Sequence, residues 1–287
     1  MLLVKHILKT NKSVFWGVTV IALLLAASLL APLISPADPL AQNLRASLNP
    51  PDGSRVFGTD SLGRDVFSRI VYGSRISLIV GVSVLTLTML VGTILGTAAG
   101  YFGGILDSVI MRVSDVLMSF PPLVLAMIVM VFTGPGVVNL VGVLVIIRWP
   151  QFARLIRGQV ISTKNMTFVD AARIAGTPPA GIVLKHILPN CFLPVIAYAT
   201  MSIGAIIVDE TALSFLGLGI QPPDPSWGVM LADAKNYISV APWLVVFPGL
   251  AIMITVFGFN LLGDGVGYLL NPKQNNRIEV IHGDIEG

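Results

Sequence analysis

Six apolar runs constrain the fold of this chain more than any other feature of its sequence. They cover about residues 14–34, 76–100, 117–133, 137–157, 192–219 and 243–270. All except the third approach or exceed the ~20 residues that a helix needs to cross the hydrocarbon core of a bilayer. With 54% hydrophobic and 11% charged residues, the chain also has more apolar surface than a soluble domain of its size can bury. The pattern predicts an all-α membrane protein with six transmembrane helices.

The third and the first runs carry additional signals. The third contains Pro121 and Pro122, which predict a kink or a helix start, and residues 110–116 are expected to extend it into the membrane interface. The first run follows a lysine-rich start, as a signal peptide would. About 21 apolar residues are too many for a signal sequence, so we expect a helix that is retained.

The distribution of Lys and Arg predicts the orientation, because these residues concentrate on the cytoplasmic side of a membrane. With the N-terminus inside, eleven of them fall in cytoplasmic segments and six in external segments, while Arg148 lies within the fourth run. Both termini and residues 159–190 are therefore expected to be cytoplasmic.

The same runs divide the chain into three parts. Residues 1–75 contain the N-terminal tail, the first transmembrane helix and an external segment. Residues 76–270 form the core transmembrane domain, and residues 271–287 are expected to form a cytoplasmic tail. Between Ser35 and Arg75, charged and apolar residues alternate at near-helical spacing, which predicts an amphipathic helix at the membrane surface.

Residues 159–190 form the longest polar stretch between apolar runs. Residues 168–175 are good helix formers, Gly176 can adopt the positive φ of a helix C-cap, and Pro178 or Pro179 suits the first turn of a second helix. The stretch predicts a helix-turn-helix, and an ordinary connecting loop is the alternative. Pro189 and Pro194 are expected to separate it from the fifth run.

This stretch resembles the cytoplasmic EAA loop of permease subunits in binding-protein-dependent ABC importers. Two positions depart from the family pattern: Asp170 replaces the usual Glu, and His186 stands where an Ile is usual. In that family the loop fits a cleft on the ATPase subunit. The residues implied to form the ATPase-coupling loop are Phe168, Asp170, Ala171, Ala172, Gly176, Ile187, Leu188 and Pro189.

Two further motifs narrow the resemblance to the dipeptide, oligopeptide and nickel branch of these permeases. One is an external motif of the form GTD-x-x-GRD-x-x-SR, and the other is the signature of the fifth span and the loop after it, residues 210–228. The external motif consists of Gly58, Thr59, Asp60, Gly63, Arg64, Asp65, Ser68 and Arg69.

The resemblance implies a type I ABC importer permease fold with a cytoplasmic coupling helix-turn-helix, in a bacterial inner (plasma) membrane. It implies that a homologous second permease and this chain enclose a translocation path for di- or oligopeptides. Two cytoplasmic ATP-binding subunits, which hold ATP and Mg²⁺, and an extracytoplasmic substrate-binding protein complete the assembly. This chain itself is expected to bind no cofactor or metal and to be no enzyme. Nickel, a metal chelate or a glutathione-like peptide is the alternative cargo.

Three charged residues within apolar runs are candidates for the translocation path or its gate: Arg148, Asp209 and Glu210. A charge near the bilayer centre costs at least about 2.5–3.5 kcal/mol, so such residues usually have a function. Adjacent helix residues point about 100° apart, so Asp209 and Glu210 face different directions. The resemblance favours Glu210, and a structural ion pair with Arg148 is the alternative.

Glycines and missing motifs complete the prediction. Gly92, Gly96 and Gly100 repeat every four residues and predict a flat face for helix packing. The chain lacks the phosphate-binding pattern G-x-x-x-x-G-K-[ST], so it is not expected to hydrolyse ATP. Its three histidines are scattered, and its single cysteine, Cys191, excludes an internal disulfide. A self-sufficient secondary transporter remains the alternative of another class, although the two halves show no internal repeat.

Overall fold

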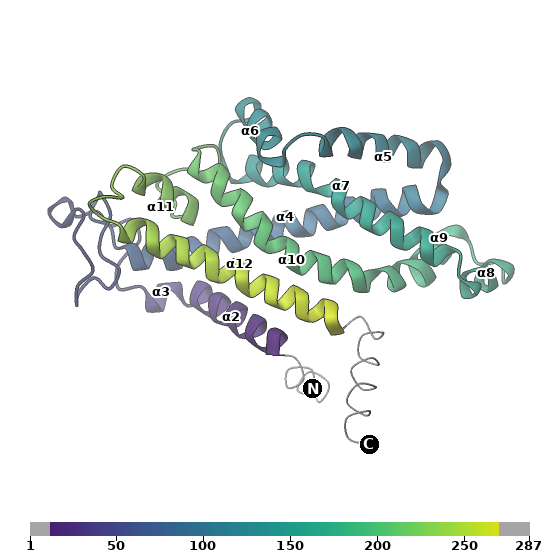
Figure 1. The fold of residues 1–287 in the computed structure, drawn as a ribbon, viewed down its shortest axis with the longest axis horizontal. Coiled ribbons are helices and arrows are strands. Elements are labelled where there is room, and N and C mark those ends of the chain that lie inside the picture. Colours follow the sequence, from purple (N-terminus) through teal and green to yellow (C-terminus); the bar gives the residue numbers. More distant parts are fainter. Residues whose placement is uncertain (1–11, 270–287) are drawn as a thin grey trace, which may run out of the picture.

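The computed structural model describes residues 12–269, which form the helical bundle of Figure 1. Residues 1–11 and the predicted tail at 271–287, with the basic residues counted there, lie outside the described residues. The long helices in chain order are α2 (Lys12–Leu29), α4 (Val66–Phe102), α5 (Gly104–Met118), α6 (Pro122–Thr133), α7 (Val137–Lys164), α10 (Leu188–Phe215) and α12 (Trp243–Leu269). The short ones are α3 (Ala31–Ile34), η1 (Leu44–Ala46), α8 (Thr167–Ile174), α9 (Pro179–Gly181), η2 (Ile182–Ile187) and α11 (Trp227–Ala234).

Five of these helices are long and apolar enough to cross a membrane, and α5 with α6 forms a sixth, broken span. The prediction of six transmembrane helices is therefore confirmed when the bent pair counts as one. The two parts of that pair meet at an angle of 92°, at the proline pair that predicted a kink. The span is longer than expected, because α5 begins at Gly104.

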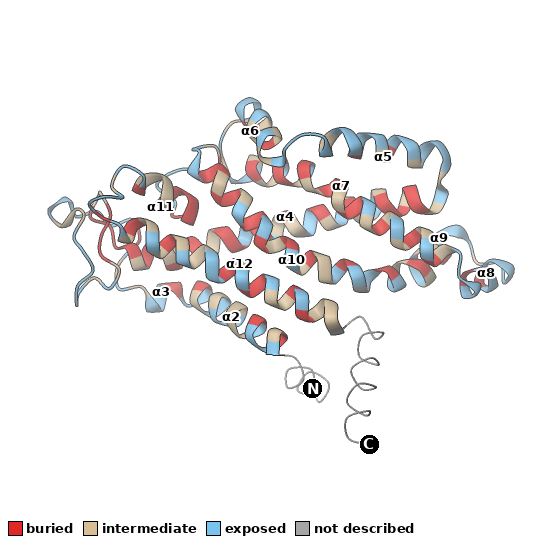
Figure 2. Cartoon of the chain, viewed as in Figure 1, coloured by how far each residue is buried: buried red, intermediate tan, exposed pale blue. Residues whose placement is uncertain are grey.

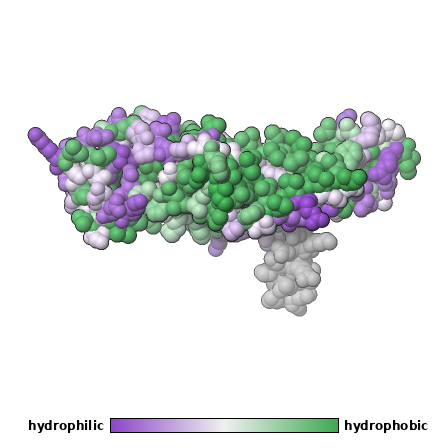
Figure 3. Space-filling model, turned by 90° about the horizontal axis from the view of Figure 1, so that it is seen from above, coloured by the Kyte–Doolittle hydropathy of each residue, from purple (hydrophilic) through white to green (hydrophobic). Residues whose placement is uncertain are grey.

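The bundle has two distinct ends. Figure 1 shows α8 at one end of the long axis, which we call the α8 end, and α11 with residues 35–65 at the other, which we call the loop end. Hydrophobic residues dominate the middle of the molecule and hydrophilic residues gather toward both ends (Figure 3). The start of α2 and the end of α12 both point toward the α8 end, as an even number of spans requires.

α4 and α7 pack closely at the centre of the bundle. Gly92, Gly96 and Gly100 lie on the face of α4 that meets α7. A Cβ added at Gly92 would lie 2.5 Å from the Cβ of Phe152, closer than real Cβ atoms approach. At Gly96 the obstacle is the backbone of Ala153. The glycines therefore let two backbones approach, as the predicted packing face requires.

The predicted amphipathic helix at the membrane surface is wrong. Asp65 caps α4, since its Oδ2 accepts a hydrogen bond of 2.8 Å from the backbone N–H of Ser68, and the helix runs without a break from Val66 to Phe102. No proline interrupts these 37 residues, so the segment expected to form a separate surface helix is instead the first part of α4. At 1.5 Å per residue α4 is about 55 Å long, well beyond the ~30 Å of a hydrocarbon core.

The polar stretch between the fourth and fifth runs is shorter than predicted. α7 continues to Lys164, and α10 begins at Leu188. Pro189 lies in the first turn of α10, where a missing N–H costs nothing, and Pro194 lies inside this helix. The two prolines therefore do not separate the stretch from the fifth span. At its other end α10 stops at Phe215, four residues before the predicted limit.

Candidate functional site

A short helix and a tight turn connect α7 to α10 at the α8 end. Gly176 has a φ of +80° and follows the last turn of α8. The N–H of Thr177 donates to the carbonyl of Ala172 and the N–H of Gly176 to that of Arg173, each at 3.1 Å. This pair of bonds is the Schellman motif, which ends a helix on a left-handed residue. The predicted helix-turn-helix is thus present, and we call residues 167–189 the coupling segment.

One face of α8 holds the coupling segment to the bundle. Val169 is fully buried and belongs to a cluster with Ile156 of α7 and Ile182 of η2. Ala172, one turn later on the same face, is also buried. Because the cluster of Val169 includes residues of α7, η2 and α10, the segment is expected to move with α7 and α10.

The opposite face of α8 is exposed. Phe168, Asp170 and Ala171 lie on it, and the side chain of Ile174 at its end is 88% exposed. Asp170 forms an ion pair of 2.8 Å with Arg173, which is also exposed. Figure 2 shows how little of α8 is buried compared with the neighbouring part of α7. An apolar tip beside a small alanine face suits docking onto another protein.

The second half of the coupling segment explains why His186 can stand where the family pattern has an Ile. Residues 182–187 form a π-helix, in which i→i+5 hydrogen bonds place an additional residue in the turn. Ile187 is fully buried, whereas His186 is half-buried and its carbonyl accepts a hydrogen bond from Asn190. The apolar side chain that packs on the bundle is therefore Ile187. Leu188 is half-buried, and Pro189 is exposed.

The three intramembrane charges separate into a pair and a single residue. Arg148 of α7 donates from Nε and Nη2 to Oδ2 of Asp209 in α10, at 2.9 and 2.5 Å. These side chains retain 14% and 23% of their exposure. Glu210 has 0% exposure and accepts hydrogen bonds of 3.0 Å from the hydroxyls of Ser77 and Ser214. Of the two acids, only Asp209 is accessible to a passing solute, which shifts our preference for a path residue from Glu210 to Asp209.

We expect Glu210→Ala to destabilise the chain, because it leaves two serine hydroxyls in a closed site without their acceptor. Each such loss costs about 1–3 kcal/mol. Glu210→Gln keeps polar atoms at both positions and is the matched control. Thermal unfolding in detergent measures the difference. A Glu210→Ala protein with normal unfolding temperature and altered uptake would instead assign Glu210 to the gate.

The external motif forms a buried ion network at the loop end. Oδ1 of Asp60 accepts hydrogen bonds of 2.9 Å from the N–H groups of Leu62 and Arg64, and its Oδ2 lies 2.6 Å from Nε of Arg64 and 3.6 Å from Nε of Arg69. Both arginines also reach Asp233 of α11, at 3.3 and 3.9 Å. All of these groups except Asp233 are nearly inaccessible.

The remaining motif residues shape the same network. Gly58 and Gly63 have φ values of +72° and +71°, and a Cβ on Gly63 would collide with the carbonyl of Asn43. Thr59 and Ser68 are fully buried, and the carbonyl of Thr59 accepts a hydrogen bond of 3.3 Å from Nε1 of Trp243. The motif therefore clamps the start of α4 to α11 and α12. Asp233 lies outside every sequence motif, so its ion pairs with Arg64 and Arg69 were not predictable from the sequence.

Known protein families match two parts of this chain. A family described as "binding-protein-dependent transport system inner membrane component" matches residues 92–276, which include the coupling segment and the intramembrane charges. The chain belongs to this family. A second family, the N-terminal TM domain of oligopeptide transport permease C, matches residues 3–51.

Three curated relatives align with 78–94% of the chain. The dipeptide transport system permease protein DppC of Alkalihalophilus pseudofirmus is 41% identical over 94% of this chain and 88% of that protein. The di/tripeptide transport system permease protein DppC of Pseudomonas aeruginosa is 39% identical over 93% and 90%. The glutathione transport system permease protein GsiD of Pectobacterium atrosepticum is 45% identical over 78% and 74%. This chain is thus a multi-pass inner-membrane permease subunit of an importer.

Proposed function

We propose that this permease subunit encloses, with a homologous second permease, a path for di- or oligopeptides. Two cytoplasmic ATPase subunits and an external binding protein complete the assembly and supply energy and specificity. The observation that carries the proposal is the exposed face of α8, a helix whose Val169 packs in a cluster with residues of α7 and α10. Relatives that are named for dipeptides, di/tripeptides and glutathione support the peptide class. ATP and Mg²⁺ belong to the partner ATPases.

In this proposal the α8 end and both termini face the cytoplasm. The basic residues of the coupling segment and of the adjacent part of α7 lie at this end, in agreement with the positive-inside rule. They are Arg154, Arg157, Lys164, Arg173 and Lys185.

The structure suggests how the ATPases act on the path. The coupling segment links the end of α7 to the start of α10, and these two helices also carry Arg148 and Asp209. A displacement of α8 by the closing ATPases changes the relative position of α7 and α10, and with it the ion pair between them. Alternation between inward-open and outward-open states requires two such arrangements of packed helices.

The assembly is tested by purifying the tagged chain from its native membrane in a mild detergent and identifying its companions by mass spectrometry. We expect a second permease, ATPases with the Walker motif and a binding protein, whose affinity for dipeptides, glutathione and nickel is then measured. Isolation of the chain alone, under conditions that keep other complexes intact, would favour a self-sufficient secondary transporter. A binding protein that takes only nickel or a metal chelate would overturn the peptide assignment.

Neutralising one member of the pair, in Arg148→Gln or Asp209→Asn, should lower both the amount of folded chain and uptake, since it leaves an unpaired charge within the membrane. The double variant should restore folding and still transport at no more than about a tenth of the normal rate, as expected of residues that line the path. Size-exclusion profiles and peptide uptake distinguish these effects. The exposed pair Arg154–Asp115 is the control, and Arg154→Gln should be nearly neutral for folding. Full uptake by the double variant would show that the pair Arg148–Asp209 has only a structural role.

A further inference from the structure

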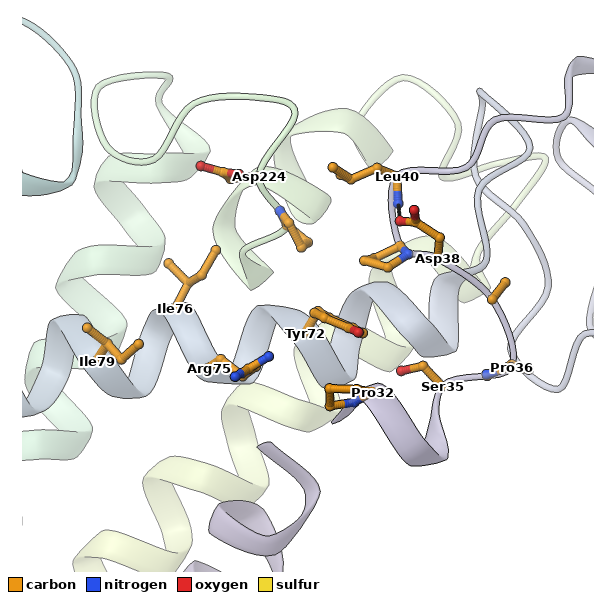
Figure 4. Close-up of a pocket in the computed structure, with 13 residues that line it drawn as sticks. Pro32, Ser35, Pro36, Asp38, Leu40, Tyr72, Arg75, Ile76, Ile79 and Asp224 are labelled. Carbon is orange, nitrogen blue, oxygen red and sulfur yellow. Dashed lines mark hydrogen bonds between the residues drawn. The ribbon is translucent and has the colours of Figure 1, made fainter. Parts of the chain in front are cut away.

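A large hollow lies at the loop end, outside the external motif and the coupling segment. Its volume is about 760 Å³, and its walls come from α3, the loop after it, the second to fourth turns of α4, and the loop before α11. Figure 4 shows Tyr72, Arg75 and Ile79 along α4, with Asp38 and Asp224 on two loops across the hollow.

The charged groups of this hollow form no ion pairs with one another within residues 12–269. Within residues 12–269, no carboxylate lies at ion-pair distance from Arg75, whose guanidinium carbon instead lies 5.8 Å from the ring centroid of Tyr72. Asp38 and Asp224 form no ion pair within residues 12–269 either, and the Asp38 carboxylate accepts a hydrogen bond of 2.8 Å from the N–H of Leu40. The hydroxyl oxygen of Ser35 is buried against the hollow without a hydrogen-bond partner in the described chain. A buried hydroxyl of this kind normally finds a partner.

An uncovered apolar stripe begins where the hollow opens. Ile79, Val82, Leu90 and Ile94 follow one another at helical spacing on α4, and each is more than half exposed. From Arg75 to Ile94 the helix rises about 28 Å, which is close to the ~30 Å thickness of a hydrocarbon core. With Arg75 at the level of the phospholipid headgroups on the loop side of the membrane, the stripe begins in the adjacent leaflet at Ile79 and continues across the hydrocarbon core to Ile94.

We propose that the hollow binds a phospholipid with an amino headgroup, such as phosphatidylethanolamine, from the leaflet at the loop end. The lipid phosphate contacts Arg75 and, after rotation of the Ser35 side chain about χ1, accepts a hydrogen bond from its hydroxyl. The ammonium group lies toward Asp38 and Asp224, and an acyl chain follows the stripe from Ile79. One cation, Arg75, and two carboxylates, Asp38 and Asp224, line the same hollow and match a headgroup that carries both charges. The apolar stripe matches a molecule with a long apolar chain, which a peptide lacks.

The probes are phosphatidylethanolamine, phosphatidylglycerol and phosphatidylcholine, added singly to the delipidated, purified full-length chain and counted by native mass spectrometry. We expect retention of phosphatidylethanolamine in preference to the other two. Arg75→Gln should lower retention of all three about tenfold, the typical effect of losing a charge-assisted hydrogen bond. Arg75→Lys should recover part of it. Asp38→Asn combined with Asp224→Asn should remove the preference and leave phospholipid binding intact.

Arg45→Gln is the matched control, because Arg45 is an exposed arginine of the loop end outside the hollow. Should Arg75→Gln fail to fold, the variant of the two exposed aspartates still tests the preference. Equal retention by Arg75→Gln and the unaltered protein would overturn the site, and so would a preference for phosphatidylglycerol. Displacement of the lipid by millimolar glycylglycine would reassign the hollow to a soluble zwitterion. None of these results depends on the ATPase partners, so the lipid site and the proposed function fail separately.

Discussion

Gly176→Val should abolish uptake and co-purification of the ATPase, with at least a tenfold loss of each, while the chain still inserts and folds. Gly176 ends α8 with a φ of +80°, a conformation that costs an L-residue about 1–2 kcal/mol and is rarer still for a β-branched one. Among residues 12–269, no atom beyond the two neighbouring residues lies within 4 Å of a Cβ added there, so the substitution acts through the backbone. The turn must rearrange, and α8 then presents its exposed face in another direction.

Two controls isolate this backbone effect. Gly158→Val places the same side chain on the exposed surface of α7, where a Cβ also has no neighbour within 4 Å and φ is helical. It should transport normally. Gly176→Asn should keep most of the activity, because asparagine tolerates the left-handed region. Normal uptake by Gly176→Val would show that the turn is not needed for coupling.

Gly96→Val should prevent the chain from reaching its folded state, an effect larger than any other single substitution proposed. A side chain at this position meets the backbone of Ala153 in α7, and a backbone cannot rotate away as a side chain can. Overpacking usually costs about 1–3 kcal/mol, and separation of α4 from α7 adds the loss of their central contact. The measurement is the yield of monodisperse protein in detergent, followed by its thermal unfolding.

Gly142→Val is the matched control for this substitution. Gly142 is a helical glycine of α7 with an exposed surface and no atom within 4 Å of an added Cβ, so valine there should leave the yield unchanged. If Gly96→Val gave the normal yield and unfolding temperature, the close approach of α4 and α7 would not be a requirement of the fold.

Local signals made several features predictable. The lengths of the apolar runs predicted the spans, because a helix needs a minimum apolar length to cross a bilayer. The proline pair at Pro121 predicted the break in the third span, because a proline lacks the N–H that continues a helix. The glycine at 176 predicted the end of α8, because glycine can adopt the positive φ of a helix C-cap. Helix limits were less predictable. Asp65 was predicted to lie within a surface helix and Pro189 to precede the fifth span, and each lies at the start of a transmembrane helix.

Pairing between distant residues was not predictable from such signals. From the sequence, either of two adjacent acids could pair with Arg148. Asp209 lies on the side of α10 that faces Arg148 and forms the ion pair, whereas Glu210 accepts hydrogen bonds from two serines. Asp233 joined the arginines of the external motif only because α11 folds back over the start of α4.

By itself, the sequence determined that this chain crosses a membrane in six helices, resembles an importer permease and carries a helix-ending turn at Gly176. These properties depend on hydrophobic length and on residue types within a few positions of one another. Only the tertiary structure decided which charges are paired, which acid is enclosed and that Arg75 has no acidic partner among residues 12–269. Such choices depend on the rotation and depth at which helices meet, and these are set by side chains far apart in the chain.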